Sequence, residues 1–367
     1  MEGFSDFPID IGGEWIHVHP SILNTLAYDN VTSEVDIVQY LSEYEEWDSG
    51  EWLVQQFSNT DYKFIDYTWF DFFNDYMGPF VEPNLHLNCQ VTSIDWSTNN
   101  DPQRSVLRCS DGRTWYADHV IVTVPIKILQ ENDIEFNPPL PQETRDAISA
   151  IQMLSGLKVF MKFSEKFYRD AFEFASDYEG IQIGQRYFYD ATYGQSSDQN
   201  ILGVFAEGEP AKPFVVMSDG DIVTAILEQL DGVFDGRATQ TFEEAFVQNW
   251  DQEPFVRGVY SHLPDGLLWP IPALRNSAME DKVFFAGEHI PVDWEWGFAH
   301  GAALSGRFAA ERVLQLLEED TDDDDDDTIE TLVPKENESA TTSSSQKFTT
   351  ASFAQILLVC GMTAYYL

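Results

Sequence analysis

The chain has 367 residues, of which 43% are hydrophobic, and a formal net charge of -43 from 63 acidic and 20 basic residues. A chain of this length and apolar content can bury a sizeable core, so we expect one large domain or two modest ones. The charge argues against nucleic acid and anionic membrane surfaces as partners and would attract cationic ligands, although solubility alone also explains it.

The numbers of aromatic residues and cysteines limit which kinds of core and of binding site the chain can form. Aromatic residues make up 14% of the chain, which requires a deep core or an aromatic-lined cavity. The three cysteines, Cys89, Cys109 and Cys360, are too few and too scattered to indicate a disulfide framework or a zinc site. We therefore expect no metal site, and the redox compartment stays open.

Segments typical of strands and helices follow one another along the chain. Residues 85–96 alternate as a strand, and Asp111-Gly112 is a hairpin-turn signal before a buried strand at 119–125. Residues 156–163 predict a strand with Leu157, Val159, Met161 and Phe163 on one face, and residues 219–234 predict an amphipathic helix. Without an internal repeat, these elements indicate an α/β or mixed α+β class.

A second buried strand at 283–286 leads into the most informative stretch. Gly287 allows close backbone approach at the strand end, where Glu288 could accept hydrogen bonds from ribose or ribityl hydroxyls or could cap a turn. Gly297 and Phe298 begin a helix rich in small residues, whose N-terminus favours an anion. Close packing of this helix on a sheet would explain the glycines equally well.

This stretch, "FFAGEHIPVDWEWGFAHGAALSGRFAAERVL" (284–314), resembles the C-terminal flavin-binding segment of the flavin-containing amine oxidases, polyamine oxidase branch. Four other stretches agree with that family in order, and the resemblance covers residues 7–317. They are "IDIGGEWIHVHP", beside the flavin ring; "VIVTVPIKILQENDIEFNPPLPQETRDAI", leading into the substrate domain; "GLKVFMKF", with the active-site lysine; and "NWDQEPFVRGVYSHLPDG", before the flavin motif.

The resemblance implies a Rossmann-like FAD-binding domain with an inserted substrate domain. The family's opening strand and Gly-x-Gly-x-x-Gly loop do not precede residue 9, so we expect an N-terminally truncated domain, as in a fragment, an incomplete gene model or a degenerate paralogue. The expected domains are FAD-binding at 1–25, 77–130 and 266–317, substrate-binding at 26–76 and 131–265, an acidic Ser/Thr-rich disordered tail at 318–352 and an apolar segment at 353–367.

The resemblance also assigns site residues. Lys158 corresponds to the lysine that holds a water against flavin N5, although a solvent-facing lysine on an edge strand would fit its alternation. His17 resembles a histidine of the substrate tunnel but could be structural. Phe298 stands where the family places an aromatic ring over the flavin, and Trp296 could share that wall. The implied cofactor contacts are Gly12, Gly13, Trp15, Val91, Trp250, Gly287, Glu288, Gly297 and Phe298.

The implied activity is FAD-dependent oxidation of amines, above all polyamines, by hydride transfer to flavin N5, with imine hydrolysis and release of hydrogen peroxide. A non-catalytic protein of the same fold without tight FAD binding is an alternative, as is a monoamine or amino-acid oxidase. The partners implied are an amine and O2, with no nucleic acid. Acceptor patterns for glycosylation at Asn30 and Asn337 and the apolar segment 353–367 leave the compartment open between a secretory or membrane-anchored protein and a soluble intracellular one.

Overall fold

The computed structural model describes residues 3–17, 19–27, 35–40, 45–48, 53–56, 61–97, 104–174, 183–264, 267–277, 279–292, 297–323 and 356–359. Its helices are α1 (Ile22–Leu26), α2 (Trp69–Tyr76), α3 (Gly78–Val81), α4 (Ile126–Gln130), α5 (Gln142–Ala150), α6 (Lys212–Val215), α7 (Asp219–Val233), α8 (Arg237–Thr241), α9 (Pro270–Arg275) and α10 (Ala299–Asp323). Short 3-10 turns lie at Glu82–Asn84 and Trp250–Gln252.

Within the described residues, the strands form five sheets of two to seven strands. They are β1 (Ile37–Gln39), β2 (Glu45–Asp48), β3 (Leu53–Gln56), β4 (Tyr62–Phe64), β5 (Val91–Asp95), β6 (Ser105–Cys109), β7 (Thr114–Ala117), β8 (His119–Val122), β9 (Glu135–Asn137), β10 (Gln152–Met153), β11 (Gly156–Phe163), β12 (Ala171–Phe174), β13 (Gly184–Asp190), β14 (Asn200–Gly208), β15 (Phe242–Asn249), β16 (Ser261–His262), β17 (Val283–Phe285) and β18 (Ile356–Val359). The mixed α/β class is therefore confirmed.

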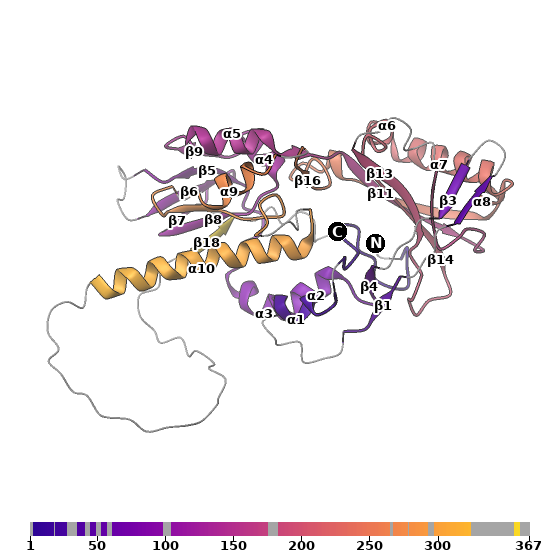
Figure 1. The fold of residues 1–367 in the computed structure, drawn as a ribbon, viewed down its shortest axis with the longest axis horizontal. Coiled ribbons are helices and arrows are strands. Elements are labelled where there is room, and N and C mark those ends of the chain that lie inside the picture. The colour runs from indigo at the N-terminus through magenta and orange to yellow at the C-terminus, as the bar shows by residue number, and fades with distance from the viewer. Residues whose placement is uncertain are drawn as a thin grey trace, which may run out of the picture.

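One body of the molecule is built around two small sheets (Figure 1). One sheet has the order β17-β8-β18 and is parallel, and the other has the order β7-β6-β5-β9. The strands predicted at 119–125 and 283–286 are β8 and β17, which pair with Val283 opposite Val120. Val120, Val122, Val283 and Phe285 are buried in one core with α4, α5 and α9. Ile121 and Phe284 are buried in a second cluster with α10, so that both faces of these parallel strands are covered.

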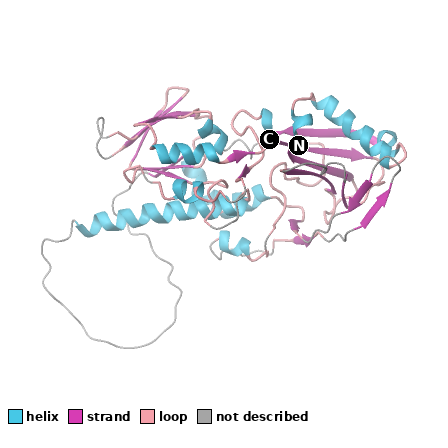
Figure 2. Ribbon diagram, turned by 45° about the horizontal axis from the view of Figure 1, so that its top comes forward, coloured by secondary structure: helices cyan, strands magenta, loops and turns pink. Residues whose placement is uncertain are grey.

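The other body is a seven-stranded sheet with the order β15-β11-β14-β13-β12-β3-β2. Helices α6 and α7 cover one face of it (Figure 2), where Leu157, Val159, Met161 and Phe163 are buried. The predicted face of this strand is confirmed. The opposite face carries Phe160 and packs against the N-terminal segment around Trp15. Because β11 lies between β14 and β15, it is an interior strand.

The hairpin predicted at Asp111-Gly112 is confirmed, since it joins β6 to β7 in an antiparallel pair. The expectation about the cysteines is wrong at one point, because Cys89 and Cys109 form a disulfide with their Cα atoms 5.4 Å apart. Cys89 precedes β5, and the pairing of β5 with β6 brings Cys109 opposite Val91. A spacing of 20 residues gives no sign of this approach, which the strand pairing creates.

Helix α10 runs beneath the first body, with its N-terminal end toward the large sheet (Figure 1). The structured part was expected to end near Leu317, but the helix continues to Asp323. Glu318 and Glu319 are good helix formers, and propagating an existing helix adds one hydrogen bond per residue. The acidic composition alone was therefore a poor guide to the end of the helix.

The predicted membrane attachment through residues 353–367 gains no support. Within the segment, only 356–359 belong to the described residues, and they form β18, which pairs in parallel with β8. No helix in the described part of the chain is long and apolar enough to cross a bilayer. The acceptor patterns at Asn30 and Asn337 lie outside the described residues.

The packing favours one change to the proposed domain limits. Strand β9 pairs with β5, and Ile148 and Ile151 lie in the core of the first body. Residues 131–153 thus pack with the expected FAD-binding domain, although they were assigned to the substrate domain. We propose that the substrate domain resumes near Leu154, just before β11 enters the large sheet.

Candidate active site

The N-terminal segment crosses the face of the large sheet that the helices leave free. The ring of Trp15 lies 5.0 Å from that of Tyr40 and 5.4 Å from that of Tyr189, in edge contacts. The indole N–H of Trp250 donates a hydrogen bond to the carbonyl of Ile11 at 3.3 Å. These contacts fix the segment between the aromatic residues of the sheet and the 3-10 turn after β15.

Lys158 is buried on this face, in the interior strand β11, with 3% of its surface exposed. Its ammonium group donates to a carboxylate oxygen of Glu14 and to the carbonyl of Asp10, both at 3.1 Å. The rings of Phe160, Tyr189 and Phe205 have their centroids 5.7 to 5.9 Å from Nζ. The edge-strand alternative for Lys158 is therefore excluded, because neither the strand nor the side chain is exposed.

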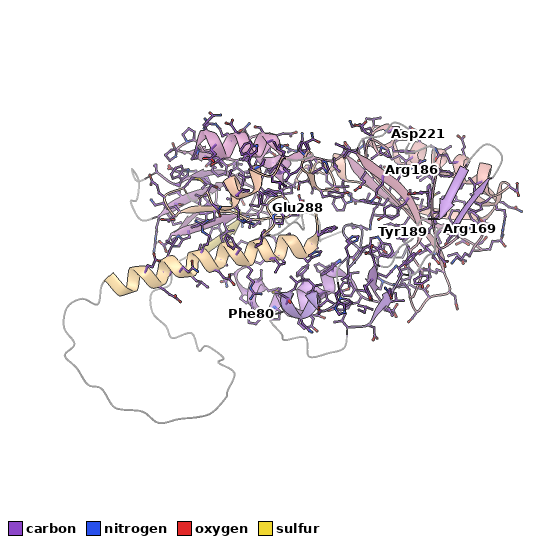
Figure 3. All side chains as sticks on the ribbon, viewed as in Figure 1. Phe80, Arg169, Arg186, Tyr189, Asp221 and Glu288 are labelled. Atoms are coloured by element: carbon purple, nitrogen blue, oxygen red, sulfur yellow. A yellow bond between two sulfur atoms is a disulfide. The ribbon has the colours of Figure 1, made fainter. Side chains whose placement is uncertain are left out.

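Glu14 joins Lys158 to a second lysine. Its other carboxylate oxygen, Oε1, accepts a hydrogen bond from Lys63 at 3.1 Å. The hydroxyl of Tyr189 donates to Oε2, the oxygen that Lys158 contacts, at 2.5 Å. Burial disfavours the carboxylate form, but the two ammonium groups and the Tyr189 hydroxyl outweigh burial and lower the pKa of Glu14. The result is a buried cluster of one carboxylate and two cations. Figure 3 labels Tyr189, which lies on the large sheet beside this cluster.

Asp10 contributes a further buried carboxyl group close to this cluster. Burial raises the pKa of Asp10 to about 8, although the backbone N–H of Trp69 donates to it at 3.1 Å. A group with this pKa is largely protonated at neutral pH. Glu14 therefore supplies the main negative charge that faces the two lysines.

His17 and Phe298 come together although 281 positions separate them, with ring centroids 4.8 Å apart. The Nδ1 atom of His17 lies 3.1 Å from a carboxylate oxygen of Asp61. Phe298 also stacks on His300, with ring centroids 5.2 Å apart and an angle of 10° between the rings. His300 is buried, which lowers its pKa, and the nearby His17 adds to that effect. Trp296 lies outside the described residues.

The strand end after β17 has a defined geometry. The carboxylate of Glu288 accepts hydrogen bonds from the backbone N–H of Ser261 at 3.1 Å and from its hydroxyl at 2.7 Å. Burial raises the pKa of Glu288, and these bonds oppose the rise. Glu288 thus holds Ser261, the first residue of strand β16, and Figure 3 places Glu288 near the N-terminal end of α10.

Two glycines at this strand end have backbone angles that favour glycine. Gly287 has φ of 142°, and Gly297, whose N–H donates to the Glu288 carbonyl at 3.2 Å, has φ of 82°. A Cβ atom at Gly297 would approach the ring of Tyr260 to 3.0 Å. Val91 lies elsewhere, at the start of β5 in the first body. The structure therefore brings together Lys158, Trp15 and Trp250 around one segment. It brings His17 and Phe298 into a tilted ring contact, while Val91 belongs to another sheet.

Sequence reasoning missed Glu14, Lys63, Tyr189 and Asp61. Glu14 lies in the segment "IDIGGEWIHVHP", between Gly13 and Trp15. A carboxylate next to residues expected to face the flavin was the one sign in the sequence that Glu14 belongs to the site. No such sign existed for Lys63 and Asp61, because their partners Glu14 and His17 lie 49 and 44 positions away in the chain.

The chain resembles known proteins in sequence. The sequence profile of the family described as "Flavin containing amine oxidoreductase" matches residues 80–314. The chain is 29% identical over 252 residues to polyamine oxidase 1 of Zea mays, which covers 67% of this chain and 48% of that protein. It is 28% identical over 232 residues to peroxisomal N(1)-acetyl-spermine/spermidine oxidase of Homo sapiens, covering 57% and 45%.

A solved structure shows the same fold. Cyclohexylamine oxidase from Brevibacterium oxydans IH-35A superposes with a TM-score of 0.57 at 19% identity, over 71% of this chain and 55% of that chain. The architecture is that of the FAD-dependent amine oxidases. The chain belongs to the flavin containing amine oxidoreductase family, and it spans about half the length of the curated relatives it matches.

FAD is the cofactor of this family, and local geometry tests whether the described residues fit a flavin ring. A Cβ atom added at Gly12 or at Gly13 would meet no atom within 4 Å, so a flat ring can approach the backbone there. The same segment carries Trp15 and the two hydrogen-bond acceptors of Lys158. The residues of this segment fit the ring portion of FAD.

Proposed function

We propose that the protein oxidises amines and that polyamines are its substrate class. The observation that carries the proposal is the buried ammonium group of Lys158, held by Glu14 and the Asp10 carbonyl on the segment that contains Gly12, Gly13 and Trp15. Burying a cation costs desolvation free energy even when a carboxylate compensates its charge, and such buried charged groups are typical of functional sites. The family membership supports the same conclusion.

The reaction needs a flavin and a set of positioned side chains. Bound FAD would supply the oxidising chemistry, as acceptor of a hydride from the carbon next to the amine nitrogen and as donor of two electrons to O2, which is reduced to hydrogen peroxide. Water would hydrolyse the imine left by hydride loss. Lys158 has three N–H donors, of which two point to Asp10 and Glu14. The third can hold a water molecule next to the ring.

His17 and Phe298 supply the amine-facing part of the proposal. With the Asp61 carboxylate at Nδ1, the proton of the neutral imidazole sits on that nitrogen, which leaves Nε2 to accept a proton from a substrate ammonium group. Phe298, in contact with the rings of His17 and His300, gives an apolar wall for the carbon chain.

A panel of amines tests the proposal. The FAD-loaded protein should release hydrogen peroxide with spermine, spermidine or their acetyl forms, and faster than with monoamines or amino acids. Turnover confined to monoamines or amino acids would support the other oxidase alternatives. A chain that shows no flavin bands after incubation with FAD would support the non-catalytic alternative.

A further inference from the structure

Glu207 is a buried carboxyl group that the reaction outlined above does not use. It lies next to the end of β14, with 4% of its surface exposed. One of its oxygens, Oε2, has no hydrogen-bond partner within the described part of the chain, while Gln185 donates a hydrogen bond to the carboxylate. Buried polar groups are nearly always satisfied, so an unpartnered carboxylate oxygen requires an explanation.

Strand pairing places Glu207 on the same face of the large sheet as Lys158. Lys158 is opposite Phe205, and Glu207 follows Phe205 by two positions, which in a strand is the same face. Directly opposite Glu207 on β11 is Gly156, which has no side chain to offer the carboxylate a partner.

Aromatic rings border the carboxyl group on this face. Tyr187 pairs with Phe205, and their ring centroids are 5.5 Å apart. Glu207 is opposite Gln185, so Tyr187, two positions further along β13, is its diagonal neighbour on the same face. After burial, the charge of Glu207 contributes to raising the pKa of Tyr187. Tyr187 is in turn hydrogen-bonded to the side chain of Trp15 in the candidate active site. Glu207 is thus connected to that site through one residue.

The chemistry of this environment selects a cation. Burial raises the pKa of Glu207 to about 8, because no positive charge compensates the ionised form. An alkylammonium group would supply both the missing charge and an N–H donor for Oε2, and the faces of Tyr187 and Phe205 attract cations. Phe205 already has one cation at its ring, the ammonium group of Lys158, 5.9 Å from the centroid.

We propose that Glu207 binds the second ammonium group of a diamine or polyamine substrate, at a distance along the carbon chain from the amine that is oxidised. The inference rests on the proposed amine oxidation for the presence of a substrate at this face. It adds the residue that would distinguish a polyamine from a monoamine. Glu207 is a binding residue in this account, and it takes no part in bond cleavage.

Equilibrium dialysis of the full chain with spermidine and with n-butylamine tests the proposal. The amines are used in excess, without oxygen and in about 0.15 M salt, so that turnover and loose surface binding are suppressed. Glu207→Gln keeps the shape but cannot ionise when a cation binds. We expect it to weaken spermidine binding by about 10- to 100-fold, as loss of a charge-assisted hydrogen bond does, and to leave n-butylamine binding nearly unchanged.

Glu209→Gln is the matched control, because Glu209 lies two positions further along, is exposed and pairs with Lys212 at 2.6 Å. It should bind both amines as the unmodified chain does. Glu207→Asp, which keeps the charge, should recover part of the spermidine affinity. Equal spermidine binding by Glu207→Gln and the unmodified chain would overturn the proposal, and so would equal weakening by Glu207→Gln and Glu209→Gln.

Failure of this inference can be told apart from failure of the proposed function. Spermidine binding that depends on Glu207, in a flavin-loaded chain that releases no hydrogen peroxide, would contradict the oxidation and keep the binding site. Hydrogen peroxide release from spermidine with the same KM in Glu207→Gln would contradict the binding site and keep the oxidation.

Discussion

Glu14 is the residue on which the buried cluster depends, because it is the carboxylate that Lys63 and Lys158 share. Each lysine also has one backbone carbonyl, from Ala191 and Asp10 respectively, which is neutral. Removing the charge of Glu14 would leave two buried ammonium groups facing each other. Breaking a buried ion pair from one side is far more costly than the pair itself is stabilising.

We therefore expect Glu14→Gln to lower the free energy of unfolding by about 3 to 5 kcal/mol. Glu244→Gln, which removes the exposed partner of Lys162, is the control and should cost less than about 1 kcal/mol. Urea unfolding followed by tryptophan fluorescence measures both. Similar values for the two variants would show that Glu14 does not hold the cluster together.

Glu207 gives a pH dependence of opposite sign to that of Glu14. Its pKa is raised in the folded protein to about 8 from an ordinary value of 4.5, so the folded state binds the proton more tightly than the unfolded state. The stability that this proton contributes is complete below pH 4.5 and is lost as the pH rises toward 8. For Glu14, whose pKa is lowered, stability is instead lost as the pH falls below 4.5.

Glu207→Gln should accordingly stabilise the protein at pH 8 relative to its effect at pH 4.5, by an amount on the order of a few kcal/mol. Unfolding midpoints of the variant and of the unmodified chain, compared at several pH values in this window, give the difference directly. A difference that does not change with pH would show that Glu207 titrates near its ordinary pKa.

At the scale of elements, the pattern of apolar residues along the chain predicted those strands whose position depends on local sequence. The alternation in residues 156–163 predicted β11 and its apolar face, and the apolar runs predicted β8 and β17. The cysteine pair could not be predicted in the same way, because Cys89 and Cys109 meet only through the register of β5 and β6. The extension of α10 to Asp323 was missed because charge composition says little about propagation of a helix that packing has already formed.

The disulfide should stabilise the first body by restricting the unfolded chain. Cys89 and Cys109 are 20 positions apart, and closing a loop of that size is worth about 3 kcal/mol in the chain-entropy description. Replacing both cysteines by serine should lower the free energy of unfolding by about that amount. Cys360→Ser serves as the control, and a double variant as stable as this control would contradict the expectation.

At the scale of the whole molecule, the resemblance predicted the family and the fold, which the family profile and the solved structure confirm. It did not predict the partners within the site. Glu14 and Lys158 are 144 positions apart in the chain, and Asp61 and His17 are 44 positions apart. Their contacts therefore arise only when folding brings the N-terminal segment into place. The roles of Lys158, His17 and Phe298 remain predictions, now with a defined setting in the structure.

The central claim is that this chain uses bound FAD to oxidise an amine. Its most direct test is the visible spectrum of the FAD-loaded protein when spermidine is added in the absence of oxygen. We predict that the flavin bands bleach and that they return when oxygen is admitted, together with hydrogen peroxide. A bound flavin whose spectrum is unchanged by spermidine, spermine, their acetyl forms and simple monoamines would contradict the account.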